Sequence, residues 1–219
     1  LAPASVQEMA DFVGLAFDLA FKYRNPAIIL ADGVIGQMME KVVLPEQRPR
    51  LTNEEVMARC PWATFGKLKH RGPNIVTSLE LDPAEMEKRN IHLQQKYAEI
   101  EEKEVRYEEI HCDDAEYLIV AFGSCARIAQ KAMEEARAEG IKVGLLRPIT
   151  LWPFPSKAIA ERSRQVKGIL TVELNAGQMV EDVRLAVECK VPVEYFGRLG
   201  GIVPDPDEVV TALKEKIIK

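Results

Sequence analysis

The sequence has few cysteines, and they are not spaced as metal ligands. Cys60, Cys112, Cys125 and Cys189 are scattered along the 219 residues without a Cys-x-x-Cys pair. This spacing encodes neither a structural zinc site nor an iron–sulfur cluster in the chain. Isolated cysteines are typical of a reduced compartment, so we expect a cytoplasmic protein.

The sequence also lacks an excess of basic residues and a long apolar run. Its net charge of -5 gives no electrostatic footprint for nucleic acid. No stretch approaches the roughly 18 uncharged apolar residues of a membrane span. We therefore predict neither a nucleic-acid partner nor a membrane partner. The chain starts at Leu1 without a signal-peptide pattern, and we expect it to be a piece of a longer polypeptide.

Motifs for nucleotide binding and for histidine chemistry are absent as well. No Gly-x-Gly-x-x-Gly or P-loop pattern occurs. None of the histidines His70, His92 and His111 lies near a serine or cysteine in a nucleophile motif, and their spacing does not match metal ligands. The sequence predicts no histidine-based triad and no metal held by this chain alone.

The first 44 residues have the pattern of the end of an α/β domain. A hydrophobic content of 47% suffices for an ordinary core. Ser5 and Glu8 form a capping box, which predicts a helix that ends before Pro26. The uniformly apolar residues 27–32 predict a buried parallel strand, and residues 36–42 predict the start of another helix.

The middle of the chain, residues 45–112, is predicted to be a connector with one long helix. Residues 45–72 show no sustained period of 2 or 3.6, which indicates irregular structure. Asp82 as N-cap and Pro83 in the first turn predict a charged helix over residues 83–107. Because its apolar stripe is thin, this helix connects two domains, lies on a partner, or is solvated and packed by one edge, which is the favoured interpretation.

Residues 113–219 alternate short apolar runs with amphipathic segments. This alternation predicts a parallel or mostly parallel sheet with helices on both faces, an α/β fold of right-handed crossovers. The predicted strands are residues 116–122, 142–148, 168–174 and 192–197. The predicted helices are residues 125–140, 155–165, 176–189 and 205–219.

Candidate ligand positions lie beyond the carboxyl ends of the predicted strands, where open α/β sheets bind ligands. They are Asp32 to Gly36, Gly123 to Ser124, Arg147 to Pro148, Glu173 to Gly177 and Gly197 to Gly201.

Two of these turns combine a glycine with a polar side chain. The turn at Gly123 and Ser124 either binds an anion on free N–H groups or uses Ser124 as an ordinary N-cap. The lack of a phosphate motif favours the cap. Asp32 with Gly33 and Gly36 indicates close approach by another backbone or by a cofactor.

The other candidates are single charged residues. Glu173 follows an apolar strand, where a carboxylate transfers a proton, pairs with a neighbouring subunit or accepts hydrogen bonds in its turn. No second carboxylate accompanies it, which favours the last two roles. Arg198 binds phosphate or carboxylate, or makes the surface or interface pair that is commoner for exposed arginines. Arg147 is held extended by Pro148 at the end of its strand.

Four stretches carry a family resemblance: "APASVQEM", "AFDLAFKYRNPAIILADGVIGQMME", "NIHLQQKYAEIEEKEVRYEE" and "GLLRPITLWPFP". Through them, the chain resembles the carboxyl-terminal part of the alpha subunit of a 2-oxoacid:ferredoxin oxidoreductase, of the 2-oxoisovalerate or 2-oxoglutarate type. The resemblance covers essentially all of the chain. It implies a thiamine diphosphate enzyme that decarboxylates a 2-oxoacid, forms an acyl-CoA and reduces ferredoxin.

The resemblance also implies a division of the chain. Residues 1–44 are similar to the end of the pyrimidine-binding domain, and residues 113–219 resemble the transketolase carboxyl-terminal domain, a parallel sheet with one antiparallel edge strand. Residues 45–112 are then the connector. The turn from Asp32 to Gly36 is expected to be the part of this chain closest to the cofactor.

The resemblance further implies an oligomer in which other subunits hold the reactive groups. Thiamine diphosphate and Mg belong to another subunit, and iron–sulfur clusters reside elsewhere, so the beta and gamma subunits, and a delta subunit in some enzymes, are the expected partners. Ferredoxin and coenzyme A act through the complex. The cofactor-activating glutamate is expected upstream of Leu1, so no catalytic residue is assigned here and the chain alone is expected to be inactive.

Two other classes remain open on the residues themselves. A non-catalytic α/β interaction module would dock its charged helix on a partner. A coenzyme A or nucleotide-binding domain would need a better phosphate loop than Gly123-Ser124.

Overall fold

The computed structural model describes residues 1–64, 66, 69 and 72–218. The helices are α1 Val6–Tyr23, α2 Gly33–Gln37, α3 Asn53–Arg59, α4 Pro83–Lys103, α5 Ser124–Ala138, α6 Ser156–Ser163, α7 Met179–Val187 and α8 Pro206–Leu213, which continues as the π-helical turn η1 Lys214–Ile218. The strands are β1 Tyr107–Ile110, β2 Tyr117–Ala121, β3 Val143–Pro148, β4 Ile169–Glu173 and β5 Val193–Gly197. We call residues 107–218 the sheet region and residues 1–44 the N-terminal segment.

The sheet has five strands in the order β1-β3-β2-β4-β5. Strands β2 to β5 are parallel, and β1 runs antiparallel to β3 with Tyr107 opposite Pro148. The predicted mostly parallel sheet with one antiparallel edge strand is therefore confirmed. The chain passes from β2 to β3 on one side and then to β4 on the other, so the connections diverge at the carboxyl ends of β2 and β4, the usual ligand position of such sheets.

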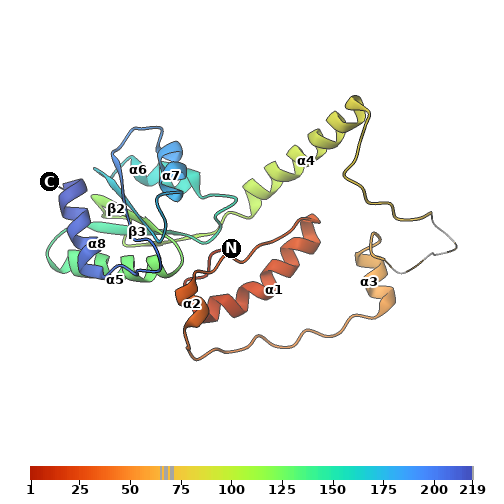
Figure 1. Cartoon of the computed structure of the whole chain (residues 1–219), viewed down its shortest axis with the longest axis horizontal. Helices are drawn as coiled ribbons and strands as arrows, with labels where there is room; N and C mark the ends of the chain where they lie inside the picture. Colours follow the sequence, from red (N-terminus) through yellow and green to blue (C-terminus); the bar gives the residue numbers. More distant parts are fainter. Residues whose placement is uncertain (65, 67–68, 70–71, 219) are drawn as a thin grey trace.

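Helices cover both faces of the sheet, as predicted (Figure 1). Strands β2, β3 and β4 are buried over almost their whole length, which explains their uniformly apolar sequences. On one face α5 and α8 pack through small and branched side chains, with Ala129, Ala132, Met133, Val209 and Leu213 among the most buried. On the other face α6 and α7 contribute Ala158, Ile159, Met179, Val183 and Val187.

Helix α1 forms as predicted, but only half of its capping box does. The Ser5 hydroxyl oxygen accepts a hydrogen bond from the Glu8 amide at 3.1 Å. The Glu8 carboxylate does not return to Ser5; it accepts from the Ala4 amide at 2.7 Å. Its other interactions reach the sheet, so Glu8 belongs to a long-range contact as well as to the helix start.

The strand predicted over residues 27–32 is not formed in the described part of the chain. Leu30 donates to the Leu1 carbonyl at 2.8 Å and the Leu1 amino group donates to the Ile28 carbonyl at 2.8 Å, but no ladder follows. Ile28 and Leu30 are exposed. An apolar run becomes a buried parallel strand only between neighbouring strands, and the described residues supply none here.

The second predicted helix, residues 36–42, is also corrected. Helix α2 begins earlier, at Gly33, and ends at Gln37 after little more than one turn. Met38 leaves in an extended conformation, and Met39 is almost fully exposed. The capping carboxylate of Asp32 determines the start of this helix, whereas the apolar residues that suggested its continuation are at most partly buried.

The connector contains one helix that the irregular pattern concealed. Helix α3 opens with a full capping box between Thr52 and Glu55, a signal present in the sequence but overlooked. His70, for which the sequence predicts neither a catalytic nor a metal-binding role, lies outside the described residues. Helix α4 begins at Pro83 with Asp82 as its cap, as predicted, but ends at Lys103 rather than 107 because the chain then turns into β1.

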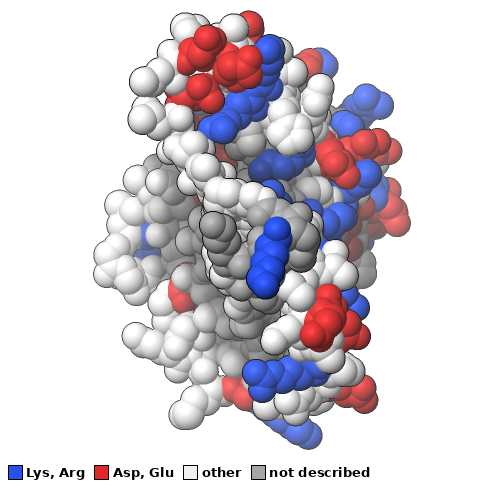
Figure 2. All heavy atoms as spheres, turned by 90° about the vertical axis from the view of Figure 1, so that its right-hand side faces the viewer, with Lys and Arg blue, Asp and Glu red and all other residues white. Residues whose placement is uncertain are grey.

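Helix α4 is packed through its last turns and projects away from the sheet at its start (Figure 1). Ile100 is its buried residue, and the ring of Tyr97 meets the ring of Trp152 edge-on at 5.7 Å. Among the described residues, basic and acidic side chains are interspersed over the face in Figure 2, so they form no broad patch of one sign there. In the described part of the chain, no helix combines the length and apolar character needed to cross a bilayer.

Gly144 in β3 offers a test of the sheet packing. A Cβ at this position would lie 2.9 Å from the His111 carbonyl oxygen and 3.0 Å from the Cys112 Cα, atoms of the backbone that cannot turn aside. We expect Gly144→Ala to lower the free energy of unfolding by about 1–3 kcal/mol, as measured by urea denaturation. Gly36→Ala is the matched control, because a Cβ there meets nothing within 4 Å. Equal stability of the two variants would contradict this packing.

Candidate functional site

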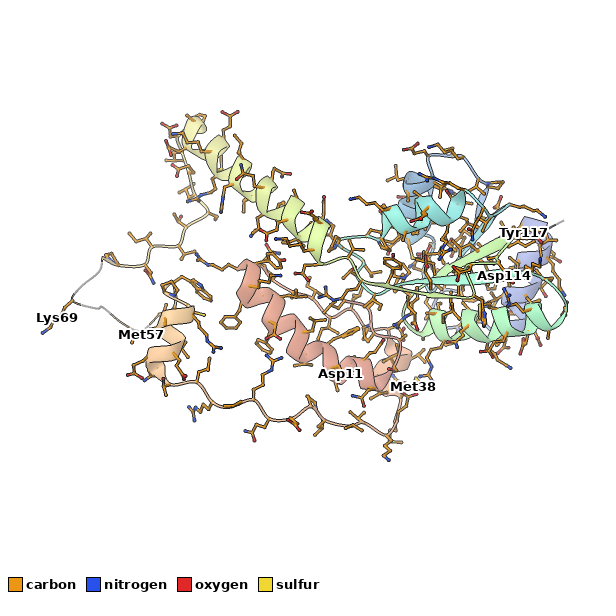
Figure 3. The ribbon with its side chains drawn as sticks, turned by 180° about the vertical axis from the view of Figure 1, so that it is seen from behind. Asp11, Met38, Met57, Lys69, Asp114 and Tyr117 are labelled. Atoms are coloured by element: carbon orange, nitrogen blue, oxygen red, sulfur yellow. The ribbon has the colours of Figure 1, made fainter. Side chains whose placement is uncertain are left out.

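Asp32 joins the N-termini of two helices. Its Oδ1 accepts hydrogen bonds from the amides of Val34 and Ile35, both at 3.0 Å, and so caps α2. Its Oδ2 accepts from the Ser124 amide at 2.8 Å, at the start of α5. Figure 3 shows Met38, just after α2, beside the sheet region at the end away from Tyr117, where β2 begins. The N-terminal segment therefore contacts the carboxyl edge of the sheet.

Gly123 makes this contact sterically feasible. Its φ of +62° lies in the region that favours glycine. A Cβ on Gly123 would also lie 2.8 Å from the Asp32 carboxylate. Ser124 is the first residue of α5 and not its N-cap, and Gly123 provides no side-chain cap, so the predicted role of Ser124 as the cap is wrong. The cap comes from Asp32, 92 residues earlier.

The glycines of the α2 turn behave differently. A Cβ on Gly33 or Gly36 would meet nothing within 4 Å in the described part of the chain. No described backbone therefore approaches them closely. Their proximity to a cofactor stays a prediction.

Arg147 at the carboxyl end of β3 binds the first turn of α1. Its guanidinium donates two hydrogen bonds of 2.7 Å to the two carboxylate oxygens of Glu8, and its Nε lies 3.0 Å from Glu108. The Arg147 side chain is only 8% exposed. Burial raises the pKa of Glu8, but the hydrogen bonds from Arg147 and Ala4 outweigh it and the pKa is lowered.

Glu173 is fully buried at the end of β4 and caps α7. Its carboxylate accepts from the amides of Gln178, Met179 and Val180 at 3.2, 2.9 and 3.0 Å. The helix has no other side-chain cap, because Gln178 at the cap position makes no such bond. Both carboxylate oxygens of Glu173 therefore accept hydrogen bonds from backbone amides at the start of α7. None of these contacts provides a partner for proton transfer.

Cys125 lies in the field of both carboxylates. Burial, together with the negative charges of Asp32 and Glu173, raises the pKa of its thiol to about 12. Since the thiolate is the reactive form, Cys125 is not a nucleophile near neutral pH. The structure thus brings Asp32, Ser124 and Glu173 to one region of the carboxyl edge without creating a reactive group there.

Arg198 contacts this region through its backbone, whereas its guanidinium binds elsewhere. Its guanidinium pairs with Glu208 in the first turn of α8 at 3.2 Å, and its amide donates to the Glu173 carbonyl at 3.2 Å. The guanidinium groups of Arg147 and Arg198 therefore bind different helices, α1 and α8.

Glu104 is a buried charge that sequence reasoning missed. Its carboxylate accepts from the Tyr23 hydroxyl at 2.5 Å and from Lys22 Nζ at 2.6 Å, and it lies 3.0 Å from Arg106. It borders a largely apolar pocket of about 340 Å³ between α1, α4 and the Leu151–Pro153 turn. In the sequence, Glu104 stands in a run of glutamates typical of a solvated helix, so no local signal separates it from its neighbours.

A metal or diphosphate site does not assemble from the described residues. Among them, no group of three or more His, Cys, Asp or Glu side chains could hold a metal ion. The carboxylate at the candidate turn, Asp32, is already bonded to three backbone amides. The described side chains therefore do not fit a Mg²⁺-diphosphate site.

Two family models match the chain. Residues 1–110 match "Pyruvate flavodoxin/ferredoxin oxidoreductase, thiamine diP-bdg", and residues 115–209 match "Pyruvate:ferredoxin oxidoreductase core domain II". The boundary between the two matches falls between β1 and β2.

Curated relatives extend beyond this chain. The chain is 48% identical over 215 residues to the ketoisovalerate oxidoreductase subunit VorB of Methanothermobacter thermautotrophicus, covering 98% of the chain and 59% of the relative. It is 32% identical to the 2-oxoglutarate synthase subunit KorA of Archaeoglobus fulgidus, covering 94% of the chain and 58% of that subunit. The chain thus spans about three fifths of the length of these relatives.

A solved structure shares the fold. The 2-oxoglutarate:ferredoxin oxidoreductase from Magnetococcus marinus aligns with a TM-score of 0.56 and 24% identity, covering 62% of this chain and 24% of that one. At this identity the likeness extends to the arrangement of strands and helices alone.

The capping role of Glu173 is testable. We expect Glu173→Ala to lower the free energy of unfolding by about 3 kcal/mol in urea denaturation, because three amides at the start of α7 lose their acceptor inside the protein. Glu181→Ala removes an exposed carboxylate from the first turn of the same helix and should cost below about 1 kcal/mol. Similar losses in both variants would refute the cap.

The buried Glu104 predicts a pH dependence. Burial raises its pKa, but the hydrogen bonds from Lys22, Tyr23 and Arg106 lower it to about 2 from an ordinary 4.5. The contribution of the Glu104 charge to the free energy of unfolding is therefore complete above pH 4.5 and is lost as the pH falls toward 2. It amounts to about 3 kcal/mol in all.

The measurement is the difference in free energy of unfolding between the unmodified chain and Glu104→Gln, taken at intervals from pH 6 to pH 2.5. We expect this difference to shrink across that range. Glu85→Gln, in an exposed pair with Lys88, should give a small, constant difference. A Glu104→Gln difference that does not change with pH would show that Glu104 does not carry this charge.

Proposed function

The chain belongs to the pyruvate:ferredoxin and pyruvate:flavodoxin oxidoreductase family, and from this premise we propose that it forms part of the alpha subunit of a 2-oxoacid:ferredoxin oxidoreductase. In the proposed reaction the 2-oxoacid loses CO₂, its acyl group passes to the coenzyme A thiol, and two electrons pass to ferredoxin. The observation that carries the proposal is the 48% identity to a ketoisovalerate oxidoreductase subunit along 98% of this chain.

The proposed cofactor is thiamine diphosphate with Mg²⁺. Thiamine diphosphate supplies a carbanion-stabilising centre when bound. The match of residues 1–110 to a thiamine diphosphate-binding family model supports the cofactor. Because the described side chains do not fit a Mg²⁺-diphosphate site, the proposal gives those groups and the iron–sulfur clusters to other subunits. No step of the reaction is assigned to a side chain of this chain.

The role proposed for this chain is to position other parts of the enzyme. Residues 1–44 end the pyrimidine-binding domain, residues 45–112 connect and supply the edge strand β1, and residues 113–219 form the rest of the transketolase-like support. Asp32 fixes the α2 turn to the rigid sheet through Ser124, which supports a positioning role for the turn from Asp32 to Gly36 beside the cofactor. The beta and gamma subunits, with a delta subunit in some enzymes, ferredoxin and coenzyme A are the proposed partners in the cytoplasm.

A branched-chain 2-oxoacid is the proposed substrate. The identity to the ketoisovalerate oxidoreductase subunit, 48%, exceeds the 32% to the 2-oxoglutarate synthase subunit. The assembled enzyme should therefore use 2-oxoisovalerate with a higher kcat/KM than 2-oxoglutarate.

The assay follows ferredoxin reduction by the purified multisubunit enzyme that contains this chain, with coenzyme A and either 2-oxoacid. We expect reduction with the assembled enzyme and none with the 219-residue chain alone. In a parallel thermal-shift titration, thiamine diphosphate with Mg²⁺ should raise the unfolding temperature of the assembly and leave that of the chain unchanged. Turnover by the chain alone, or equal stabilisation of both, would refute the proposed division.

A further inference from the structure

The first turn of α5 has the features of an anion site. This helix is 15 residues long and starts at the carboxyl end of the central strand β2, where the connections diverge. Free amides and the helix dipole make such a terminus attractive to negative charge. Gly123, at the cap position, brings no side chain of its own and leaves the space open.

The site already contains a carboxylate. Asp32 Oδ2 accepts the Ser124 amide at 2.8 Å, and it occupies the place that a Cβ on Gly123 would invade. No Lys or Arg is among the main causes of the shift of its pKa in the described part of the chain. Burial raises that pKa, and the amides of Ile35, Ser124 and Val34 lower it below its usual range. The charge of Asp32 is thus stabilised by the backbone.

A second observation points to a ligand at the same place. The Ser124 side chain is buried, and it lies close enough to the carboxylate to contribute to the lowering of its pKa. Yet its hydroxyl makes no hydrogen bond of good geometry in the described part of the chain. The site therefore has a second polar group beside the carboxylate, in addition to the one α5 amide that Asp32 uses.

Besides a hydrogen bond of 2.7 Å from the Ala2 amide to the Ile149 carbonyl, two ion pairs join the N-terminal segment to the sheet region. Arg147 binds Glu8, and Arg127 binds Glu40 at 2.6 Å, so both ion pairs depend on a basic side chain. The Asp32 contact depends on backbone amides, the nearby Ser124 hydroxyl and the space beside Gly123. An untethered carboxylate can meet the same requirements.

We propose that the β2–α5 turn is a carboxylate-binding site with Asp32 as its resident ligand, and that a free monocarboxylate of formate size binds there once the Asp32 side chain is shortened. The site thereby holds the N-terminal segment on the sheet as a tethered ligand. This proposal does not depend on the proposed enzymatic activity.

The test is chemical rescue of Asp32→Ala in the full 219-residue chain. Formate replaces the carboxylate that this substitution removes. In sodium chloride we expect the unfolding temperature to fall by roughly 5 °C, because α2 and α5 lose a shared acceptor. Sodium formate at equal ionic strength should restore most of that loss with saturation and leave the unmodified chain unchanged. Equal effects of formate and chloride on Asp32→Ala would overturn the proposal.

Two variants make the rescue specific. Ser124→Pro removes the donating amide at a helix position where proline is tolerated, so Asp32→Ala combined with Ser124→Pro should not respond to formate. Asp82→Ala removes a carboxylate that caps α4 alone, through Ala84 and Glu85, and should not be rescued either. Rescue of either variant would mean that formate acts on helix starts in general, which overturns the proposal.

A third measurement covers failure to fold. If Asp32→Ala does not fold in chloride, its recovery on refolding in formate is measured by far-ultraviolet circular dichroism. Recovery supports the site, and the absence of recovery overturns it. Asp32→Asn fills the same space with a neutral amide, so it should be less stable than the unmodified chain and insensitive to formate; a formate response would again overturn the proposal.

Discussion

Two carboxylates at the carboxyl edge of the sheet, those of Asp32 and Glu173, are bonded to backbone amides at the N-termini of α2, α5 and α7. A buried charge is costly unless hydrogen bonds replace its hydration. Here the amides at the helix starts provide those bonds. In return, α5 and α7 receive side-chain caps that their own cap residues do not provide. These hydrogen bonds position the N-terminal segment and the turns at the carboxyl edge of the sheet.

This interaction also explains why the described residues form no reactive group at the point where the connections of the sheet diverge. The groups that a ligand would use, free amides and open space beside Gly123, are already engaged by Asp32. Cys125, buried between the two carboxylates, is held in its thiol form. The carboxyl edge of the sheet is therefore organised to hold the N-terminal segment, which agrees with the positioning role proposed for this chain.

Much of the sheet region could be predicted from sequence, because β2, β3 and β4 are largely apolar and the helices amphipathic, and both are local patterns. The four candidate turns of the sheet region do lie at strand ends for the same reason, whereas the turn from Asp32 to Gly36 follows no strand in the described part of the chain. The edge strand β1, with the sequence YEEI, has no such apolar pattern and was not predicted as a strand. What each turn binds was not predictable, since Asp32 and Ser124 are 92 residues apart and Arg147 and Glu8 are 139 residues apart. Residues 27–32 are predicted as a strand from their apolar character, but the strand does not form, because an apolar run does not specify which strands lie beside it.

The pairing of Glu8 with Arg147 has a consequence for synthesis. The ribosome completes α1 long before β3 exists, and at about 5–20 residues per second the interval is roughly 7–28 s. For most of that time neither Arg147 nor the Ser124 amide is available to hold the N-terminal segment. Phe17 and Phe21, which stay exposed even in the finished chain, are then on the surface of an undocked amphipathic helix. Until the third strand has emerged, the nascent N-terminal segment therefore lacks the sheet that holds it in the folded chain.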